Sequence, residues 1–199
     1  MGHRYAEIAF TDDVKAVQDT MNSRRFYEKM ETGADTNAAL TPVEADFIAA
    51  RDSFYIASVG ADGWPYMQHR GGPPGFVKRL ADGRLGYADF RGNRQYVTLG
   101  NAAGNDRVSL FFMDYANRLR LKIFGRMSVT DDPSVVTALA VPGYAGRIEH
   151  GVLIDVEAFD WNCPQHIAPR FTETEMAERL APLQARIDEL ESYLQQVAA

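Results

Sequence analysis

The chain has 199 residues, enough for one domain with a substantial core and too few for two large ones. Its hydrophobic fraction of 46% and charged fraction of 24% are those of a globular protein, and it contains no run of about 18 apolar residues that would predict a membrane-spanning helix. The net charge of −6 and the pI near 5.2 speak against nucleic-acid binding, which usually requires a basic domain.

The cysteine content and the first residues bear on the compartment. Cys163 is the single cysteine, which excludes an internal disulfide framework and is typical of a reducing compartment. Residues 1–7 lack the apolar core of a secretory signal. We therefore expect a cytoplasmic protein that binds neither nucleic acid nor a membrane.

Helical signals dominate residues 11–51. Thr11 precedes two aspartates at positions where the helix dipole favours acidic residues, which predicts a helix from there to about Met21. Thr41 and Glu44 have the spacing of a capping box and enclose a proline in the first turn, which predicts a second helix up to Arg51.

Alternating apolar and polar residues then predict strands. The predicted strands are 54–59, 65–70, 84–88, 107–113, 118–125 and 151–159, and residues 76–78 resume the sheet after a glycine- and proline-rich segment, 71–75. Asp-Gly pairs at 62–63 and 82–83 supply turns, and a short helix is predicted from 132 to 139. These elements indicate a mainly β fold with peripheral helices (α+β), built on a six-stranded antiparallel barrel over residues 53–160.

The C-terminal residues predict one long helix, 172–197. Thr172 and Glu175 repeat the capping-box spacing at its start. Apolar residues follow at alternating intervals of four and three over about three heptads: Met176, Leu180, Leu183, Ile187, Leu190, Leu194 and Val197. Such a seam packs either on the body of the protein or on a partner chain, and it hints at a dimer. We expect residues 1–199 to form a single domain with helices at both ends.

Charge is distributed unevenly along the chain. Between His69 and Arg126 there are 11 Lys and Arg residues but only 4 Asp and Glu residues, so an acidic protein has a basic middle. This asymmetry favours a local anionic ligand, with charges merely spread over strand faces as the alternative. On the strand 118–125, Arg118, Arg120 and Lys122 share one face, which suits either an anion or a solvated outer face.

The segment from Asp89 to Tyr96 is the strongest candidate for anion binding. Arg91 and Arg94 enclose a glycine that permits close approach of the backbone, and each guanidinium offers a planar fork of donors that matches phosphate. The alternative is a solvated polar turn before a helix. Side chains suited to the edge and face of a heteroaromatic ring are Gln68, Asn93, Gln95, Asn101, Asn162, Gln165 and Trp161. Together these features indicate a nucleotide-like cofactor on a β scaffold.

Other chemistries find little support in the sequence. The four histidines, His3, His69, His150 and His166, lack metal-ligand spacing, so no metal site is predicted. Cys163 lies close to His166, but a lone cysteine is more often an inert small hydrophobic residue than a nucleophile. The chain has no P-loop and no Gly-x-Gly-x-x-Gly after a strand. No catalytic residue is assigned.

Six short motifs occur in an order that resembles one known family. They are Arg51–Tyr55, Gln68–Pro73, Arg91–Tyr96, Asn105–Arg107, Met113–Tyr115 and Trp161–His166. In this order they resemble the pyridoxamine 5′-phosphate oxidase-related flavin-binding proteins, over roughly residues 46–171. The resemblance implies an FMN-binding split barrel that is a homodimer, with FMN at the subunit interface.

The resemblance also implies roles for individual residues. Arg70 and Arg94 match positions that hold the FMN phosphate, and Arg120 stands where the family usually has a glutamine beside the isoalloxazine ring. Arg120 or Lys122 would stabilise the anionic reduced flavin. Tyr87, with its neighbour Ala88, lies where a strand passes the flavin. The full set of implied cofactor contacts is Gln68, His69, Arg70, Tyr87, Ala88, Arg91, Asn93, Arg94, Gln95, Arg120, Lys122, Trp161 and Gln165.

The substrate is less well defined than the cofactor. The segment Trp161–Gln165 departs from the true oxidases, which end in an arginine-histidine motif for pyridoxal phosphate, so we expect an unidentified small substrate other than pyridoxamine phosphate. Two functions stay open: an FMN-dependent oxidoreductase, or a non-catalytic flavin-binding carrier, sensor or stress protein. A haem-handling split barrel lacks an axial-ligand signature.

Overall fold

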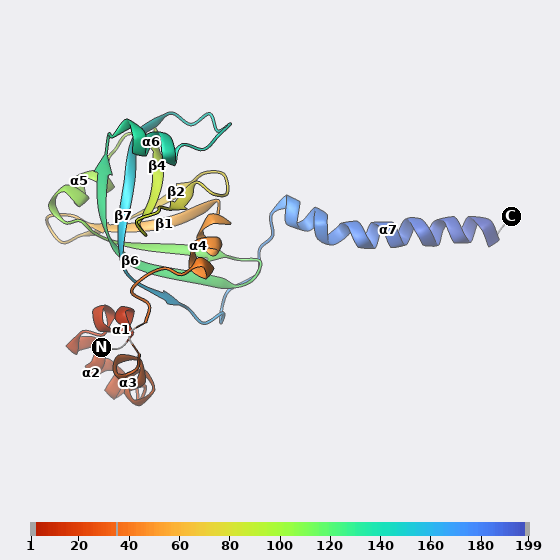
Figure 1. Cartoon of the computed structure of the whole chain (residues 1–199). Coiled ribbons are helices and arrows are strands. Elements are labelled where there is room, and N and C mark those ends of the chain that lie inside the picture. Colours follow the sequence, from red (N-terminus) through yellow and green to blue (C-terminus); the bar gives the residue numbers. More distant parts are fainter. Residues whose placement is uncertain (1–2, 35, 198–199) are drawn as a thin grey trace. The chain divides into compact units, whose positions relative to one another are not determined.

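A mainly antiparallel sheet of seven strands carries the fold (Figure 1). The computed structural model describes residues 3–34 and 36–197. The strand order is β2-β1-β5-β6-β7-β4-β3. Antiparallel pairing joins β1 to β2 and β5, β4 to β3 and β7, and β6 to β7. The strands are β1 (Ser53–Val59), β2 (Pro65–Gly71), β3 (Val77–Arg79), β4 (Leu85–Phe90), β5 (Arg107–Asp114), β6 (Leu119–Thr130) and β7 (Ile148–Trp161).

The prediction of an antiparallel sheet with peripheral helices is confirmed, but the six-stranded barrel is not. In the part of the chain that the structure describes, the sheet has seven strands and ends at β2 on one side and β3 on the other, so it is not closed. Between the end of β2 and the start of β3 the chain leaves the sheet, because Pro73 and Pro74 have no N–H to donate to a neighbouring strand. Gly75 in this segment has a φ of 84°, a conformation that favours glycine. The predicted continuation at 76–78 is therefore a separate strand.

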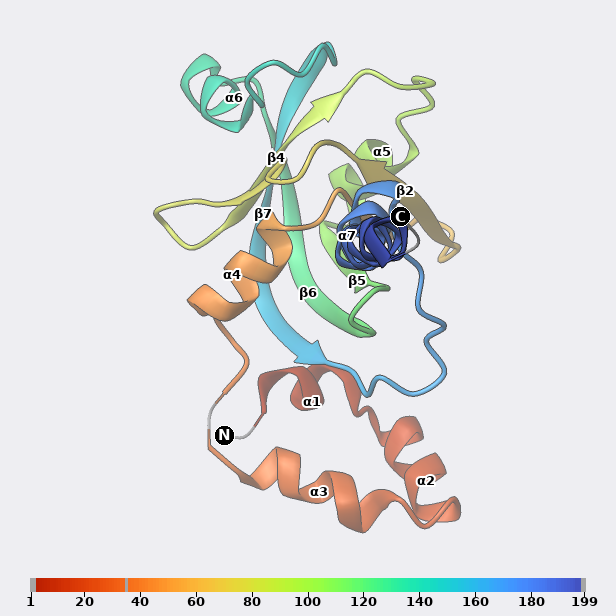
Figure 2. The same cartoon turned by 90° about the vertical axis from the view of Figure 1, so that its right-hand side faces the viewer.

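Helices α2 and α4 begin where the capping patterns predict them. The Thr41 hydroxyl accepts a hydrogen bond from the Val43 N–H, and Glu44 Oε2 accepts one from the Thr41 N–H, as in a capping box. Helix α5 contacts β1 and β2, and α6 lies beside β4 and β7 (Figure 2). The helices are α1 (Arg4–Ala9), α2 (Asp12–Thr20), α3 (Arg24–Thr32), α4 (Pro42–Ala49), α5 (Val97–Gly104), α6 (Pro133–Leu139) and α7 (Glu173–Val197). None of the described helices is both long and apolar enough to cross a membrane.

The main core fills the concave side of the curled sheet. Phe54 lies at its centre, with ring centroids of Phe76, Tyr87 and Phe112 within 5.0 to 5.9 Å. All four side chains are buried, and burial of aromatic surface of this kind is a dominant source of folding free energy. A second, smaller cluster is formed by Ala88, Leu139 and Leu153 under α6. The successive residues of β4 therefore face two different cores.

The described residues fall into two compact units. One comprises the residues up to Met113 together with Arg120–Cys163, and the other comprises Asp114–Leu119 and the residues from Pro164 onward. In the second unit the Asp114 carboxylate accepts hydrogen bonds from the backbone and side-chain nitrogens of Asn117, at 2.9 and 3.0 Å. Helix α7 has no buried residue. The single domain over residues 1–199 stays a prediction.

Candidate functional site

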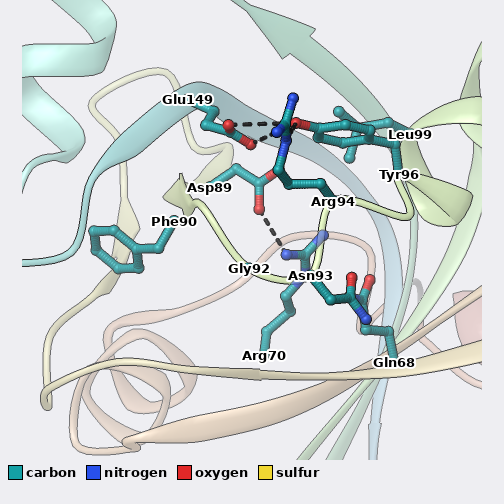
Figure 3. Close-up of a pocket in the computed structure, with 10 residues that line it drawn as sticks. All are labelled: Gln68, Arg70, Asp89, Phe90, Gly92, Asn93, Arg94, Tyr96, Leu99 and Glu149. Carbon is teal, nitrogen blue, oxygen red and sulfur yellow. Dashed lines mark hydrogen bonds and ion pairs between the residues drawn. The ribbon is translucent and has the colours of Figure 1, made fainter.

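The candidate site is a cavity of about 210 Å³ in the first unit, between the ends of β2 and β4, the segment 91–96 and the start of β7 (Figure 3). Two arginines and two acidic residues share it with amide, aromatic and aliphatic side chains. Its lining residues are Gln68, Arg70, Asp89, Phe90, Gly92, Asn93, Arg94, Tyr96, Leu99 and Glu149. The cavity is therefore polar and contains both charge signs.

An ion pair between β2 and β4 forms one wall. Arg70 Nη1 donates to Asp89 Oδ1 at 2.6 Å, and the two side chains are 16% and 6% exposed. Burial raises the pKa of Asp89 above its ordinary value, although the Arg70 charge opposes the shift. Arg70 Nε is buried and has no hydrogen-bond partner among the described residues. The Nε edge of this guanidinium thus has no partner within the part of the chain that the structure describes.

The segment 91–96 forms the opposite wall in an uncommon backbone conformation. Arg94 and Tyr96 have φ values of 63° and 51°, in the left-handed region that residues other than glycine rarely adopt. The Asn93 carboxamide oxygen accepts a hydrogen bond from the Gln95 N–H at 3.2 Å, which supports the turn. Backbone strain of this kind is often found at ligand sites, because the surrounding structure must hold it in place.

A polar network fixes the side chains of this wall. Arg94 Nε donates to the Tyr96 hydroxyl oxygen at 3.3 Å, and the Tyr96 hydroxyl donates to Glu149 Oε2 at 3.1 Å. Arg91 Nε also lies 3.5 Å from Glu149 Oε1. Arg94 is exposed, so its remaining guanidinium donors are accessible to solvent. The network orients Arg94 at the rim and neutralises Glu149.

Amide groups add neutral donors to the cavity. The Thr98 hydroxyl, on α5, donates to Gln68 Oε1 at 2.9 Å, which directs the Gln68 amide group away from Thr98. Gln68 and Arg70 reach the cavity together because alternate residues of a strand share one face. In Figure 3 the Gln68 and Asn93 side chains lie on the same side of the cavity, opposite Phe90. Guanidinium and amide donors of this type bind oxyanions such as phosphate.

Several residues predicted as cofactor contacts lie outside this cavity. His69 points to the other face of β2, where it is exposed and its ring lies 5.5 Å from that of Tyr55. Tyr87 is buried in the main core, where burial raises the pKa of its hydroxyl although the nearby Arg70 charge opposes the shift. Ala88 belongs to the smaller core. Neither Arg91 nor Gln95 lines the cavity.

A second group of predicted contacts gathers at the other end of β6 and β7. Trp161 Nε1 donates to Glu44 Oε1 at 2.8 Å, and its ring lies 4.7 Å from that of Phe47. Lys122 Nζ lies 3.3 Å from Asp160 Oδ2 and 4.6 Å from the centre of the Tyr5 ring.

Arg120 and Gln165, two further predicted contacts of the cofactor, also lie outside the cavity. The Nε atom of Arg120 is buried and has no hydrogen-bond partner in the described residues. Gln165 is exposed in the second unit. The structure therefore brings Gln68, Arg70, Asn93 and Arg94 together and leaves Arg120, Lys122 and Trp161 elsewhere.

The sequence reasoning missed the acidic half of the cavity. Asp89 is the first residue of the candidate segment 89–96, and that position was a usable signal. Glu149 gave no such signal, since it preceded the predicted strand at 151–159, whereas β7 begins at Ile148. Among the described residues, no group of three or more His, Cys, Asp or Glu side chains could hold a metal ion.

Comparisons with known proteins connect this geometry to a family. A family model described as pyridoxamine 5′-phosphate oxidase matches residues 40–154, which include every residue that lines the cavity. The structure of HupZ from Group A Streptococcus is similar at a TM-score of 0.50 and 16% identity, covering 66% of this chain and 100% of that one. No match was found among curated proteins.

Two other solved structures are similar at lower scores. A Clostridium acetobutylicum protein related to general stress protein 26, of the pyridoxinephosphate oxidase family, has a TM-score of 0.45 and 14% identity, covering 67% of this chain and 94% of that one. An FMN-binding protein from Syntrophomonas wolfei subsp. wolfei has a TM-score of 0.46 and 8% identity, covering 75% and 97%.

Proposed function

The chain belongs to the pyridoxamine 5′-phosphate oxidase family, and we propose that it is an FMN-binding oxidoreductase that holds the cofactor phosphate in the cavity between Arg70 and Arg94. The observation that carries this proposal is the convergence of two guanidinium groups and the amides of Gln68 and Asn93 on one small cavity. These are the donor types that bind a phosphate with geometric specificity.

The cavity suits one end of FMN rather than the whole molecule. Its volume of about 210 Å³ is below the roughly 300–1,000 Å³ typical of sites that enclose a complete small ligand. We assign the phosphate and the adjoining part of the ribityl chain to it. The isoalloxazine ring then lies outside the cavity, and in the proposal a second copy of the chain covers it, so that the protein is a homodimer.

The charges of the cavity leave room for this anion. Asp89 contacts Nη1 of Arg70, whereas Nε of the same guanidinium is buried without a partner, so the ion pair and a phosphate contact do not compete for the same atom. The acid at the rim, Glu149, is already paired with Arg91 and hydrogen-bonded to Tyr96. A desolvated N–H without a partner costs free energy, which an oxyanion at Nε would recover.

FMN, when bound, supplies the electron and hydride transfer, and the protein supplies binding, orientation and exclusion of water. None of the cavity's lining residues is a His, Cys or Lys, and we assign no catalytic residue. The substrate remains a small molecule other than pyridoxamine phosphate, and a cytoplasmic location stays part of the proposal. His69, Tyr87, Ala88, Arg91, Gln95, Arg120, Lys122, Trp161 and Gln165 stay predicted contacts of the cofactor.

The oxidoreductase function is tested with the FMN-loaded protein under anaerobic conditions. NADH, NADPH and dithionite are added in turn, and the loss of flavin absorbance is followed against the same concentration of free FMN. We expect bleaching by one nicotinamide to be at least about tenfold faster than in free FMN, because a bound substrate is oriented for transfer. Bleaching by dithionite alone would contradict an enzyme that uses a nicotinamide, and would favour the flavin-binding carrier or sensor.

A further inference from the structure

Helix α7 presents an apolar seam that the other described residues of its own unit do not cover. The seam consists of seven residues, each between 38% and 67% exposed: Met176, Leu180, Leu183, Ile187, Leu190, Leu194 and Val197. Side chains at intervals of four and three residues form one stripe along a helix. Single apolar residues scattered over a surface are common, but an exposed, continuous apolar stripe of this length marks an interaction surface.

The central heptad of the seam has the composition that favours a two-stranded coiled coil. In a heptad written abcdefg, the a positions are Leu180, Ile187 and Leu194, and the d positions are Met176, Leu183, Leu190 and Val197. The central heptad has isoleucine at a followed by leucine at d, the combination that favours two strands. Pro182 occupies position c, away from the seam, and without an N–H it removes the backbone hydrogen bond to the Glu178 carbonyl, near the start of the seam.

The charges beside the seam determine the orientation of the partner. Arg179 and Arg186 occupy g positions, and Glu191 occupies an e position. In a parallel pair, a g residue faces the e residue five positions later on the other helix, so Arg186 of each copy faces Glu191 of the other. In an antiparallel pair, g faces g and e faces e, and no arginine meets an acid. Charge complementarity at Arg186 and Glu191 therefore favours the parallel arrangement of two identical helices.

We propose that α7 pairs with α7 of a second copy of this chain as a parallel, in-register, two-stranded coiled coil. Within one chain, Arg186 Nη1 lies 2.5 Å from Glu189 Oε2, but Glu189 is at position c and both side chains are more than half exposed. Exposed pairs of this kind contribute little, so Arg186 can turn to Glu191 of the second copy. This pairing is independent of the proposed flavin site, which lies in the other unit.

Disulfide trapping in the full chain tests both the pairing and its direction. Cys163→Ser removes the native thiol, and Leu180→Cys then places a cysteine at an a position near the start of the seam. Glu178→Cys, at position f on the outer face of the same turn, is the matched control. We expect the Leu180→Cys protein to form the covalent dimer about tenfold faster or more, because facing thiols have a millimolar effective concentration.

An antiparallel pair of α7 helices would give a different cross-linking pattern. In an antiparallel pair, residue 180 of one helix faces the far end of the other, so Leu180→Cys chains would cross-link to Val197→Cys chains and not to each other. That result would overturn the parallel arrangement. Equal cross-linking rates for Leu180→Cys and Glu178→Cys would overturn the pairing altogether, while FMN binding by the same proteins would be unaffected.

Charge reversal tests the contact that sets the direction. In the Leu180→Cys background, Arg186→Glu places two acids opposite each other and is expected to slow cross-linking several-fold. Adding Glu191→Arg restores opposite charges across the seam and is expected to restore the rate. Glu189→Arg, at position c, is the control that leaves the rate unchanged. A failure of the double reversal to recover would contradict the assigned pair of Arg186 and Glu191.

Discussion

Arg70 on β2 and Asp89 on β4 form an ion pair at 2.6 Å although four strands separate β2 from β4 in the sheet order. The sheet curls so far that side chains of nearly opposite edges meet, while the backbone ladder between the two ends stays open. The ion pair thus spans the open side of the sheet, and the candidate site lies beside it.

We predict that Arg70→Ala destabilises the protein by about 2–4 kcal/mol at pH 7, because it leaves the buried Asp89 carboxylate without its cation. Without Arg70, which opposes the shift, the folded-state pKa of Asp89 rises further above its unfolded value. The penalty is then complete above the folded pKa and disappears as the pH falls through it. Urea unfolding at pH 7 and near pH 4 should show the deficit shrinking, and a deficit independent of pH would contradict the role of Asp89.

Two substitutions of Arg94 separate its backbone from its side chain. Arg94→Gly and Arg94→Ala both remove the guanidinium, but only glycine adopts a φ of 63° without steric strain. We expect the glycine variant to melt about 2–4 °C above the alanine variant. Differential scanning calorimetry of the two proteins measures this directly. Equal melting temperatures would mean that the left-handed conformation at Arg94 is not retained.

Trp161→Phe tests the hydrogen bond that ties β7 to α4. The change keeps an aromatic ring against Phe47 and removes the indole N–H that donates to Glu44, so we expect a loss of about 1.5–3 kcal/mol at pH 7. Burial alone would raise the pKa of Glu44, but hydrogen bonds from Thr41 and Trp161 outweigh it and hold the pKa below its ordinary value. The stability that this carboxylate contributes is present above pH 4.5 and is lost as the pH falls through the folded pKa. Urea midpoints of wild type and variant should therefore converge in acid.

Two glycine substitutions, one in β6 and one in α5, are expected to change the stability in opposite directions. A Cβ at Gly125 would lie 2.7 Å from the Asp155 backbone oxygen, which cannot move aside, so Gly125→Ala should cost about 1–3 kcal/mol. At Gly100, inside α5, nothing lies within 4 Å of a Cβ, and Gly100→Ala should stabilise by about 0.5–1 kcal/mol through helix propensity. The pairing of β6 with β7 shifts register between Phe124 and Gly125, as at a β-bulge. Chemical denaturation measures both substitutions, and a neutral Gly125→Ala would contradict this close pairing.

Local patterns of the sequence identified most elements, because capping and alternation act over a few residues. The capping box at Thr41 begins α4, and Thr172 with Glu175 forms the same reciprocal hydrogen bonds before α7. The alternation of Arg120 and Lys122 with buried Leu121 and Ile123 along β6 is also confirmed. These signals need no knowledge of the tertiary structure.

Contacts between residues far apart in the sequence could not be predicted from these local patterns. The proximity of Arg70 to Asp89 depends on how far the sheet curls, and the entry of Glu149 into the cavity depends on where β7 begins. One miss was avoidable: Gln68 and Arg70 share a face of β2, so strand alternation already placed His69 on the other face. The proposed partner of the heptad seam is a second copy of the chain. The sequence of one copy shows only the charges beside the seam, and these do not by themselves show that the two copies pair.

FMN binding by the arginine variants tests the central claim most directly. Quenching of FMN fluorescence is titrated with wild type, Arg70→Lys, Arg94→Ala and, as a control, Arg84→Ala, whose partly exposed side chain pairs with Asp82 away from the cavity. We predict that wild type binds with a Kd of about 1 μM or lower, that Arg70→Lys and Arg94→Ala each weaken binding by about tenfold or more, and that Arg84→Ala matches wild type. Absence of quenching by the wild-type protein, or equal affinity in all four proteins, would contradict the assignment of the FMN phosphate to this cavity.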